Sequence, residues 1–496
     1  MRSAGKCVQL DGLHPAAYGA LPERFYARLD PAPAANPRLI KLNEALAREL
    51  GLGTDALSAE EQARLFSGSA VPCGVQPLAA AYAGHQFGGF VPQLGDGRAI
   101  LLGDALGGGG RPYDVQLKGS GRTPYSRGGD GRAAVGPVLR EFLVSEAMHA
   151  LGIPSTRTLA AVTTGESVYR EVPLPGAVLT RVAASHVRVG TFQYFAARGD
   201  VDGVRTLADY AIARHYPEIQ GAARPQLELL RAVTRAQAGL IARWMRVGFI
   251  HGVMNTDNMA VSGETIDFGP CAFMDEFDPL KVFSSIDSHG RYAYANQPHV
   301  AAWNLTRFAE TLLPLIDADT DRAVALASEV LEEFGPRYSE LLVEGMRAKI
   351  GLAGSREDED GALIEALLDA MHAGEADFTL TFRGLSELGV GAGIGGLFAN
   401  AAGFEAWLER WRARLARDPT SPAERADRMR AVNPVYIPRN HRIEQVITAA
   451  VEHGDFAPFE AMAAALARPY EERAGLEKYA QPPSRAERVT KTFCGT

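Results

Sequence analysis

Short apolar runs separated by glycine clusters fill residues 90–122. Runs at 93–102 and 113–118, with four consecutive glycines between them, are typical of antiparallel strands joined by tight turns. Further strands are expected at 167–170 and 177–180. This part of the chain therefore predicts a strand-rich lobe.

Helical periodicity replaces the strand pattern in most of the remaining chain. A helix is expected at 138–151, where apolar residues form one stripe before a glycine and a proline, and another at 227–247, where they share one face. Leucines spaced four apart predict a shorter helix at 42–52. Beyond about residue 301 nearly everything reads as helices, so a helix-rich lobe is expected to follow the strand-rich one.

The composition excludes several classes of protein. The chain has 496 residues, of which 46% are hydrophobic and 22% charged, as in an average globular protein. A formal net charge of −8 argues against a dedicated nucleic-acid-binding protein, while leaving room for a local basic cleft. No apolar run has the length of a signal peptide or a membrane span, so we expect a cytoplasmic protein without membrane association.

The four cysteines give no sign of a shared structural site. Cys7, Cys73, Cys271 and Cys494 lie far apart and include no CxxC pair. Neither a zinc knuckle nor a disulfide framework is therefore expected.

One candidate pair for holding phosphates is Lys118 and Glu141. Lys118 ends a strand-like run, and Glu141 lies in the helix expected at 138–151. A lysine on the third strand paired with a glutamate on the next helix is how protein kinases hold nucleotide phosphates. Glu146 is the rival partner, on a different part of the helix surface.

A glycine turn precedes this pair. Gly95 and Gly97, followed by Arg98, would let backbone N–H groups approach phosphates, although a plain hairpin turn explains the same residues.

A more specific motif lies after the helix expected at 227–247. His251 and Asn258 are seven residues apart, the distance between the His and Asn of the kinase catalytic loop. Nine residues after Asn258, Asp267 begins an Asp-Phe-Gly triplet, whose aspartate binds Mg²⁺ in kinases. Both motifs in this order, after the glycine turn and the Lys–Glu pair, predict a kinase-like nucleotide and metal site.

One position departs from the kinase pattern. Where a kinase has its catalytic aspartate, two residues after His251, this chain has Val253, which cannot accept a proton. Asp257, next to Asn258, could act as a relocated base, a metal ligand or a loop cap, and spacing alone does not choose among them.

Seven segments together resemble the selenoprotein O (SelO) family over essentially the whole chain. These segments are YAGHQFG (82–88), PQLGDGR (92–98), QLKGSGRTPYSR (116–127), REFL (140–143), HGVMNTDN (251–258), IDFGPCAFMD (266–275) and NPVYIPR (433–439). The resemblance implies an α+β, protein-kinase-like two-lobed fold. We expect an N-terminal extension (1–84), a nucleotide-binding core (85–300) whose strand-rich lobe ends at about residue 205, and a helical C-terminal region (301–496).

The resemblance also implies an activity. Members of the family are pseudokinases that bind ATP turned around and transfer AMP to Ser, Thr or Tyr hydroxyl groups of proteins, so that pyrophosphate leaves. UMP transfer, with Mn²⁺ in place of Mg²⁺, is a close chemical variant. A small-molecule kinase of the aminoglycoside-phosphotransferase type and a catalytically silent nucleotide-binding protein are the alternatives.

Site residues follow from the resemblance position by position. Glu141 resembles the family's partner of Lys118. Asn258 and Asp267 resemble the Mg²⁺ ligands, and Asp257 resembles the proton acceptor. The implied ATP contacts are Gly95, Gly97, Arg98, Lys118, Asp130, Gly131, Arg181, Arg188 and Asp267.

The tail of the chain resembles a redox element of the family. Relatives can join a cysteine near the C-terminus to one near the Asp-Phe-Gly segment. A reversible disulfide between Cys271 and Cys494 is therefore a hypothesis, and a buried Cys271 with a free tail thiol is the alternative.

Overall fold

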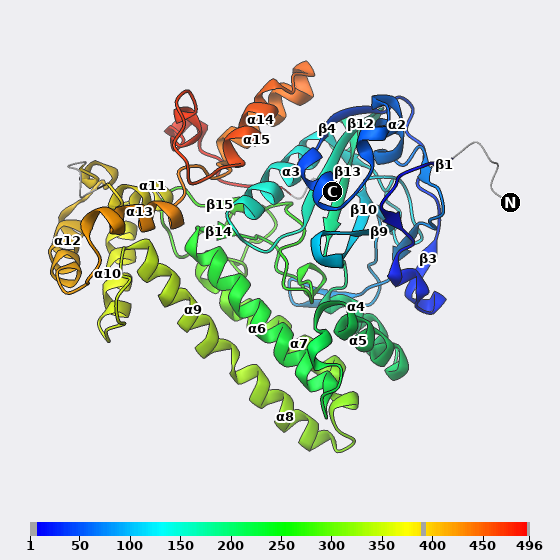
Figure 1. Cartoon of the computed structure of the whole chain (residues 1–496), viewed down its shortest axis with the longest axis horizontal. Coiled ribbons are helices and arrows are strands. Elements are labelled where there is room, and N and C mark those ends of the chain that lie inside the picture. The colour runs from blue at the N-terminus through cyan, green and yellow to red at the C-terminus, as the bar shows by residue number, and fades with distance from the viewer. Residues whose placement is uncertain (1–6, 388–392, 494–496) are drawn as a thin grey trace.

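The computed structural model describes residues 7–387 and 393–493. It has a β-sheet built by the first part of the chain and helices that extend away from one side of it (Figure 1). The fold is thus α+β, with a strand-rich part before a helix-rich part, as the sequence predicts. None of the helices within these two ranges is long and apolar enough to cross a membrane.

The central sheet has nine strands, all of whose pairings are antiparallel. Seven lie in the order β3-β6-β9-β10-β13-β12-β4, while β11 pairs with β13 and β2 with β9. The strands are β2 (Leu13–His14), β3 (Tyr26–Arg28), β4 (Arg38–Leu42), β6 (Leu78–Ala80), β9 (Ala99–Leu106), β10 (Pro112–Lys118), β11 (Ala133–Ala134), β12 (Arg157–Tyr169) and β13 (Pro173–Ala183).

Residues 7–84 contribute to this sheet, because they supply β2, β3, β4 and β6. The helix expected at 42–52 is shorter than predicted. Leu42 ends strand β4, and the Asn43 side chain caps helix α1 (Glu44–Glu49) by accepting a hydrogen bond from the Leu46 N–H group. Helix α2 (Ala59–Phe66) follows, and both helices contribute to an apolar core on one face of the sheet.

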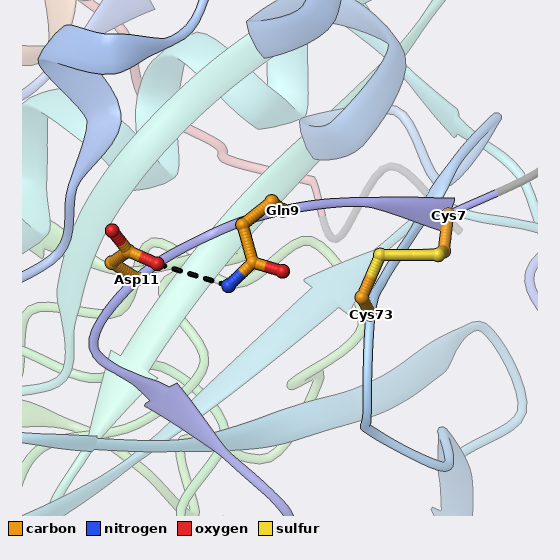
Figure 2. Close-up of a disulfide and its surroundings, with 4 residues drawn as sticks. All are labelled: Cys7, Gln9, Asp11 and Cys73. Atoms are coloured by element: carbon orange, nitrogen blue, oxygen red, sulfur yellow. Dashed lines mark hydrogen bonds between the residues drawn. A yellow bond between two sulfur atoms is a disulfide. The ribbon is translucent and has the colours of Figure 1, made fainter.

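A disulfide joins Cys7 to Cys73, contrary to the expectation from cysteine spacing (Figure 2). Strands β1 (Cys7–Val8) and β5 (Val71–Pro72) pair in parallel, which brings the two cysteines together across a sequence separation of 66. A pairing made by two such short strands leaves no local spacing signal from which this disulfide could be predicted.

Helix α3 (Val135–Ala150) covers the other face of the sheet and carries Glu141. Its bounds lie within three residues of those predicted. Helices α14 (Asn440–His453) and α15 (Ala457–Leu466) pack against α3 from the opposite side, although they lie about three hundred residues later in the chain (Figure 1).

The helical part begins with α4 (Val189–Ala196), α5 (Val201–His215) and α6 (Pro225–Arg246), the last of which closely matches the predicted helix at 227–247. A hairpin of β14 (Phe249–Ile250) and β15 (Ala272–Phe273) then encloses the His251 and Asp267 segments. Helix α7 (Gln297–Ile316) packs against α4 and α6.

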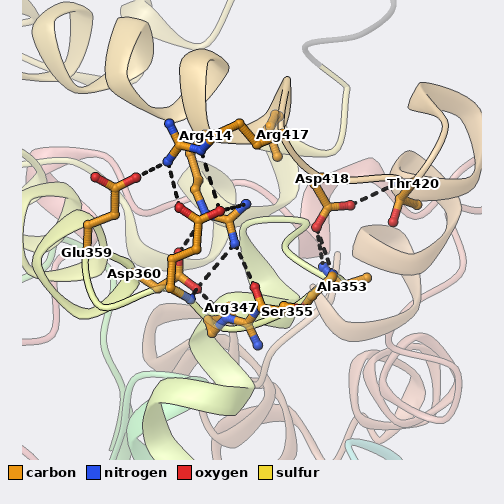
Figure 3. A network of polar contacts seen from close by, with 12 residues as sticks. Arg347, Ala353, Ser355, Glu359, Asp360, Arg414, Arg417, Asp418 and Thr420 are labelled. Carbon is orange, nitrogen blue, oxygen red and sulfur yellow. Dashed lines mark hydrogen bonds and ion pairs between the residues drawn. The ribbon is translucent and has the colours of Figure 1, made fainter.

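The C-terminal region is helical, as predicted. Its further helices are α8 (Thr320–Glu332), α9 (Phe334–Lys349), α10 (Asp360–Ala373), α11 (Phe378–Leu385), α12 (Ala402–Leu415) and α13 (Pro422–Val432). A buried polar network joins three of them (Figure 3). The carboxylate of Asp360 on α10 accepts hydrogen bonds from Arg347 Nε on α9 and from Arg414 Nε on α12, each at 2.8 Å. Asp360 is fully buried, so this network anchors the packing of these helices.

Candidate active site

A cavity of about 460 Å³ lies between the sheet and the helical part. It collects nearly all of the site residues that the sequence analysis singled out. The predicted residues that line it are Gly95, Gly97, Arg98, Lys118, Asp130, Gly131, Arg181, Arg188, Asp257, Asn258 and Asp267.

Lys118, at the end of β10, contacts two carboxylates. Its Nζ atom lies 2.6 Å from Oε2 of Glu141 on α3 and 2.7 Å from Oδ1 of Asp267. The rival Glu146 is engaged elsewhere, because it pairs with Arg157 and accepts a hydrogen bond from the Thr158 N–H group. Glu141 is therefore the glutamate that lies beside Lys118.

Asp267 is surrounded by three cations. Besides Lys118, Nη1 of Arg181 lies 2.8 Å from Oδ1, and Nη1 of Arg188 lies 2.9 Å from Oδ2. Arg181 comes from β13, and Arg188 from the loop that follows it. Burial alone would raise the pKa of Asp267, but the three cations outweigh it and hold this pKa well below its usual range. The Asp267 carboxylate is therefore ionised.

The backbone of Asp267 lies in the left-handed region, with φ of 65°. Residues without a glycine's freedom adopt this conformation at a cost, and such strain is often found at functional sites. Phe268, the next residue, is buried in the core and fixes the turn.

Asp257 lies in a short 3-10 turn, Thr256–Asn258, with its carboxylate facing the cavity. Oδ2 accepts a hydrogen bond from Gln86 Nε2 at 3.2 Å, whereas Oδ1 is buried and has no hydrogen-bond partner in the described part of the chain. Burial raises the pKa of Asp257 to about 6, although the nearby Arg188 opposes the shift. A Cβ atom at Gly84 would come within 2.6 Å of Oδ1, so only glycine fits beside this carboxylate.

Asn258 and Asp267 could hold a divalent cation. Asn258 Nδ2 donates to the main-chain oxygen of Val253 at 2.9 Å, which leaves its Oδ1 for another contact. An amide oxygen and an ionised carboxylate are oxygen ligands that suit Mg²⁺ or Mn²⁺. A cluster of three or more His, Cys, Asp or Glu side chains with metal-binding geometry is absent from the described residues, so water or phosphate oxygens would have to complete the shell.

The glycine turn packs tightly against the segment that follows Thr123. A Cβ atom at Gly95, whose φ is 94°, would lie 2.5 Å from the Tyr125 ring, and one at Gly97 would lie 2.8 Å from the Tyr125 main-chain oxygen. Thr123 Oγ1 also donates to the main-chain oxygen of Asp96 at 2.7 Å. Both glycines are required for this close approach.

Asp130 is held by an arginine that the sequence analysis did not identify. Nη1 of Arg170, at the end of the β12 hairpin, lies 2.8 Å from Oδ2 of Asp130. The hydrogen bonds from Arg170 lower the pKa of Asp130 against the effect of its partial burial. Gly131, with φ of 68°, lies against the Gly121 main chain. Arg170 lies beside Asp130 because of the fold, so it can be recognised as a site residue from the structure and not from a local sequence motif.

Tyr82 and Gln86 are further cavity residues without an assigned role in the sequence analysis. The guanidinium carbon of Arg188 lies 4.8 Å from the centre of the Tyr82 ring, a cation–π contact. Tyr82 and Gln86 both lie in the YAGHQFG segment. The resemblance of that segment to the SelO family was the sequence signal that could have identified them.

Cys271 is buried directly after the Asp267 turn, and its Sγ lies 3.3 Å from the Phe268 main-chain oxygen. Cys494 lies outside the described residues. The chain just before it runs past this turn, because Thr492 Oγ1 donates to the main-chain oxygen of Pro270 at 2.5 Å. The Cys271–Cys494 pairing remains a prediction.

Comparison with known proteins agrees with this geometry. The model of the family described as protein adenylyltransferase SelO matches residues 9–467. The chain belongs to the SelO family. It is 63% identical over 486 residues to a protein nucleotidyltransferase YdiU of Rhizobium leguminosarum bv. trifolii, covering 97% of this chain and 96% of the relative.

Other relatives in the SelO family are nearly as similar. The proteins of the same name from Rhizobium meliloti and from Bradyrhizobium sp. strain BTAi1 are each 60% identical, covering 97% of this chain and 98% of each relative. Membership of the SelO family makes this chain a nucleotidyltransferase and agrees with the kinase-like fold.

Proposed function

We propose that the cleft transfers AMP from ATP to serine, threonine or tyrosine hydroxyl groups of other proteins and releases pyrophosphate. The observation that carries this proposal is the convergence of Lys118, Arg181 and Arg188 on one side of a cavity. Charge of this density suits a polyphosphate leaving group. The names of the relatives, protein nucleotidyltransferase, support nucleotidyl transfer to a protein.

The three cations would bind the phosphates of ATP. Each guanidinium group of Arg181 and Arg188 offers a planar fork of donors that matches phosphate oxygens. The ion pair with Glu141 would keep Lys118 aimed into the cavity. The other cavity residues that we assign to ATP are Gly95, Gly97, Arg98, Asp130, Gly131 and Asp267.

Asp257 would accept the proton of the attacking hydroxyl group. The acceptor oxygen forms a bond to the α-phosphorus while the bond from that phosphorus to its bridging oxygen breaks, and the electron pair leaves with pyrophosphate. The proton passes to the carboxylate of Asp257, which lines the cavity. Val253, at the place of a kinase's base, cannot take this role.

Asn258 and Asp267 would hold Mg²⁺ or Mn²⁺ through their side-chain oxygens. When bound, the cation neutralises phosphate charge. The low pKa of Asp267 keeps this ligand ionised at any physiological pH.

Two labelled forms of ATP test the proposal against its alternatives. With label on the α-phosphate, the protein fraction of a lysate should become labelled, and with label on the γ-phosphate it should not. The variant Asp267→Ala should lose the transfer. A γ-label on a small molecule would support a small-molecule kinase, and no transfer of either label would support a catalytically silent protein. Competition by unlabelled UTP tests UMP transfer.

We also propose that Cys271 and Cys494 form a reversible disulfide. The contact between Thr492 and the Pro270 main chain supports it, because it brings the tail to the segment that carries Cys271. Peptide mapping without reductant should find a linked peptide that contains both cysteines, and its absence from the oxidised protein would refute the pairing.

A further inference from the structure

A short hairpin beside Asp257 presents an exposed strand edge. Its strands, β7 (Gly84–Gln86) and β8 (Gly89–Val91), form a two-stranded sheet of their own. The β7 side lies on the loop that carries Asp257, since the His85 N–H group donates to Thr256 Oγ1 at 2.7 Å. In the described parts of the chain, β8 has no strand on its other side.

The register of the hairpin shows which backbone groups face outward. In an antiparallel pair, residues alternate between exchanging hydrogen bonds with the opposite residue and pointing away from it. Because His85 directs its N–H group to Thr256, His85 and the opposite residue Phe90 do not exchange hydrogen bonds with each other. The N–H and C=O groups of Phe90 therefore point to the open edge of β8, where an added strand could bind them.

Large apolar side chains are exposed on the hairpin and in the cavity beside it. Phe87 and Phe90 are 38% and 39% exposed, and Ile286, which also lines the cavity, is 59% exposed. Large side chains exposed together beside a cleft are typical of an interaction surface.

A cation that has no acidic partner among the described residues lies next to the hairpin. Arg291 stacks over the Trp303 ring, with 4.8 Å from the guanidinium carbon to the ring centre. It forms no ion pair with any residue in the ranges 7–387 and 393–493, and its Nε atom is buried without a hydrogen-bond partner there. The turn of the hairpin is close, because a Cβ atom at Gly88 would lie 3.7 Å from the Arg291 guanidinium group.

We propose that the hairpin edge, together with Phe87, Phe90 and Arg291, is the docking surface for the acceptor segment of the target protein. The occupant is an extended polypeptide that adds a third strand along β8 and carries an acidic residue for Arg291. Gln86 and Phe87 line the cavity, so a chain that pairs with Phe90 and continues past the turn reaches the cavity within a few residues, at about 3.3 Å per residue. This inference rests on the proposed transfer to protein hydroxyl groups.

A backbone-methylation scan tests the added strand with the wild-type enzyme. Synthetic peptides with a single hydroxyl residue, each N-methylated at one position, are labelled from α-labelled ATP. Because Phe90 is the β8 residue whose backbone groups face outward, labelling should fall about tenfold when the peptide position opposite Phe90 is methylated and stay unchanged at the positions on either side of it, an alternation set by the added strand. Loss without this alternation, or no loss at any position, would overturn the added strand.

A charge swap tests Arg291. Wild-type enzyme should label peptides flanked by glutamate about fivefold better than peptides flanked by lysine, as expected for a single charge pair near a protein surface. The variant Arg291→Glu should reverse this preference, whereas Arg410→Glu, an equal charge change at an exposed position on α12, should keep it. The ratio of two peptides measured on one enzyme sample does not depend on how much of the sample is folded.

The outcomes separate the two proposals. If wild-type enzyme labels peptides without register dependence and Arg291→Glu keeps the original preference, the docking surface is wrong and the transfer reaction stands. If wild-type enzyme labels neither peptides nor the proteins of a lysate, the proposed function fails and this inference fails with it.

Discussion

Nη1 of Arg188 lies 2.9 Å from Oδ2 of Asp267 and 2.7 Å from the main-chain oxygen of Asp257. One nitrogen atom thus connects the segment assigned to metal and phosphate with the segment assigned to proton transfer. The Arg188 side chain is almost completely buried, so its position is set by the protein.

Replacing this arginine should disturb both segments at once. Arg188→Lys keeps the positive charge but lacks the planar fork of donors. We expect transfer of α-label to fall by at least about tenfold, since a hydrogen bond between charged groups contributes roughly 1.5–3 kcal/mol. The exposed Arg410→Lys serves as the control and should keep full activity. Equal rates for the two variants would contradict the role of Arg188.

Gly84 tests the space around Asp257. In Gly84→Ala, the new Cβ atom would meet Oδ1 of Asp257 at 2.6 Å, so the carboxylate must shift. The rate of labelling should drop by about a hundredfold, the usual loss of rate when a catalytic group is displaced by about 1 Å. Gly403→Ala on α12, where the nearest atom to the new Cβ lies at 3.6 Å, should have wild-type activity. An active Gly84→Ala enzyme would show that Asp257 does not need its present position.

Glu264 predicts a pH-dependent stability. Burial raises its pKa to about 7 from the ordinary 4.5, against hydrogen bonds from Ser262 and the Ala184 N–H group. A raised pKa means that the protonated form favours folding. This stabilisation is complete below about pH 4.5 and is lost as the pH rises through about 7.

The variant Glu264→Gln removes this titration. Relative to wild type, its free energy of unfolding should rise between pH 5 and pH 8, by an amount on the order of 2 kcal/mol. Urea unfolding at the two pH values measures it. A constant difference between variant and wild type would mean that Glu264 has an ordinary pKa in the folded protein.

The polar network around Asp360 predicts a large loss of stability (Figure 3). Asp360→Asn removes the charge shared by the buried Arg414 and the half-buried Arg347. We expect the free energy of unfolding to fall by about 3–5 kcal/mol, as is usual when one partner of a buried ion pair is lost. Glu340→Gln, which breaks a surface pair with Arg337, should cost less than about 1 kcal/mol. Similar urea midpoints for both variants would argue against the network.

The sequence allowed accurate predictions where local patterns determine structure. The apolar face of α6 gave bounds within two residues, and the chemistry of Lys118 and Glu141 identified two side chains that lie in contact. Helical periodicity and short motifs each involve residues that are close in the sequence, so they can be recognised without knowing the fold.

The remaining features depend on contacts between distant segments. The Cys7–Cys73 disulfide requires the β1–β5 pairing, and the contact of Gln86 with Asp257 requires a hairpin to fold onto a loop far along the chain. Neither has a local sequence signal. The expected helix at 42–52 was shortened because Leu42 pairs in the sheet, where tertiary contacts outweigh helix periodicity.

Tandem mass spectrometry of an acceptor protein tests the central claim most directly. After incubation with ATP and Mg²⁺, wild-type enzyme should add an adenosine monophosphate group to a serine, threonine or tyrosine side chain, and Asp257→Asn should add at least about a hundredfold less while still binding ATP. A phosphate group on the acceptor, or equal modification by the Asp257→Asn variant, would contradict the assignment of the cleft to AMP transfer with Asp257 as the proton acceptor.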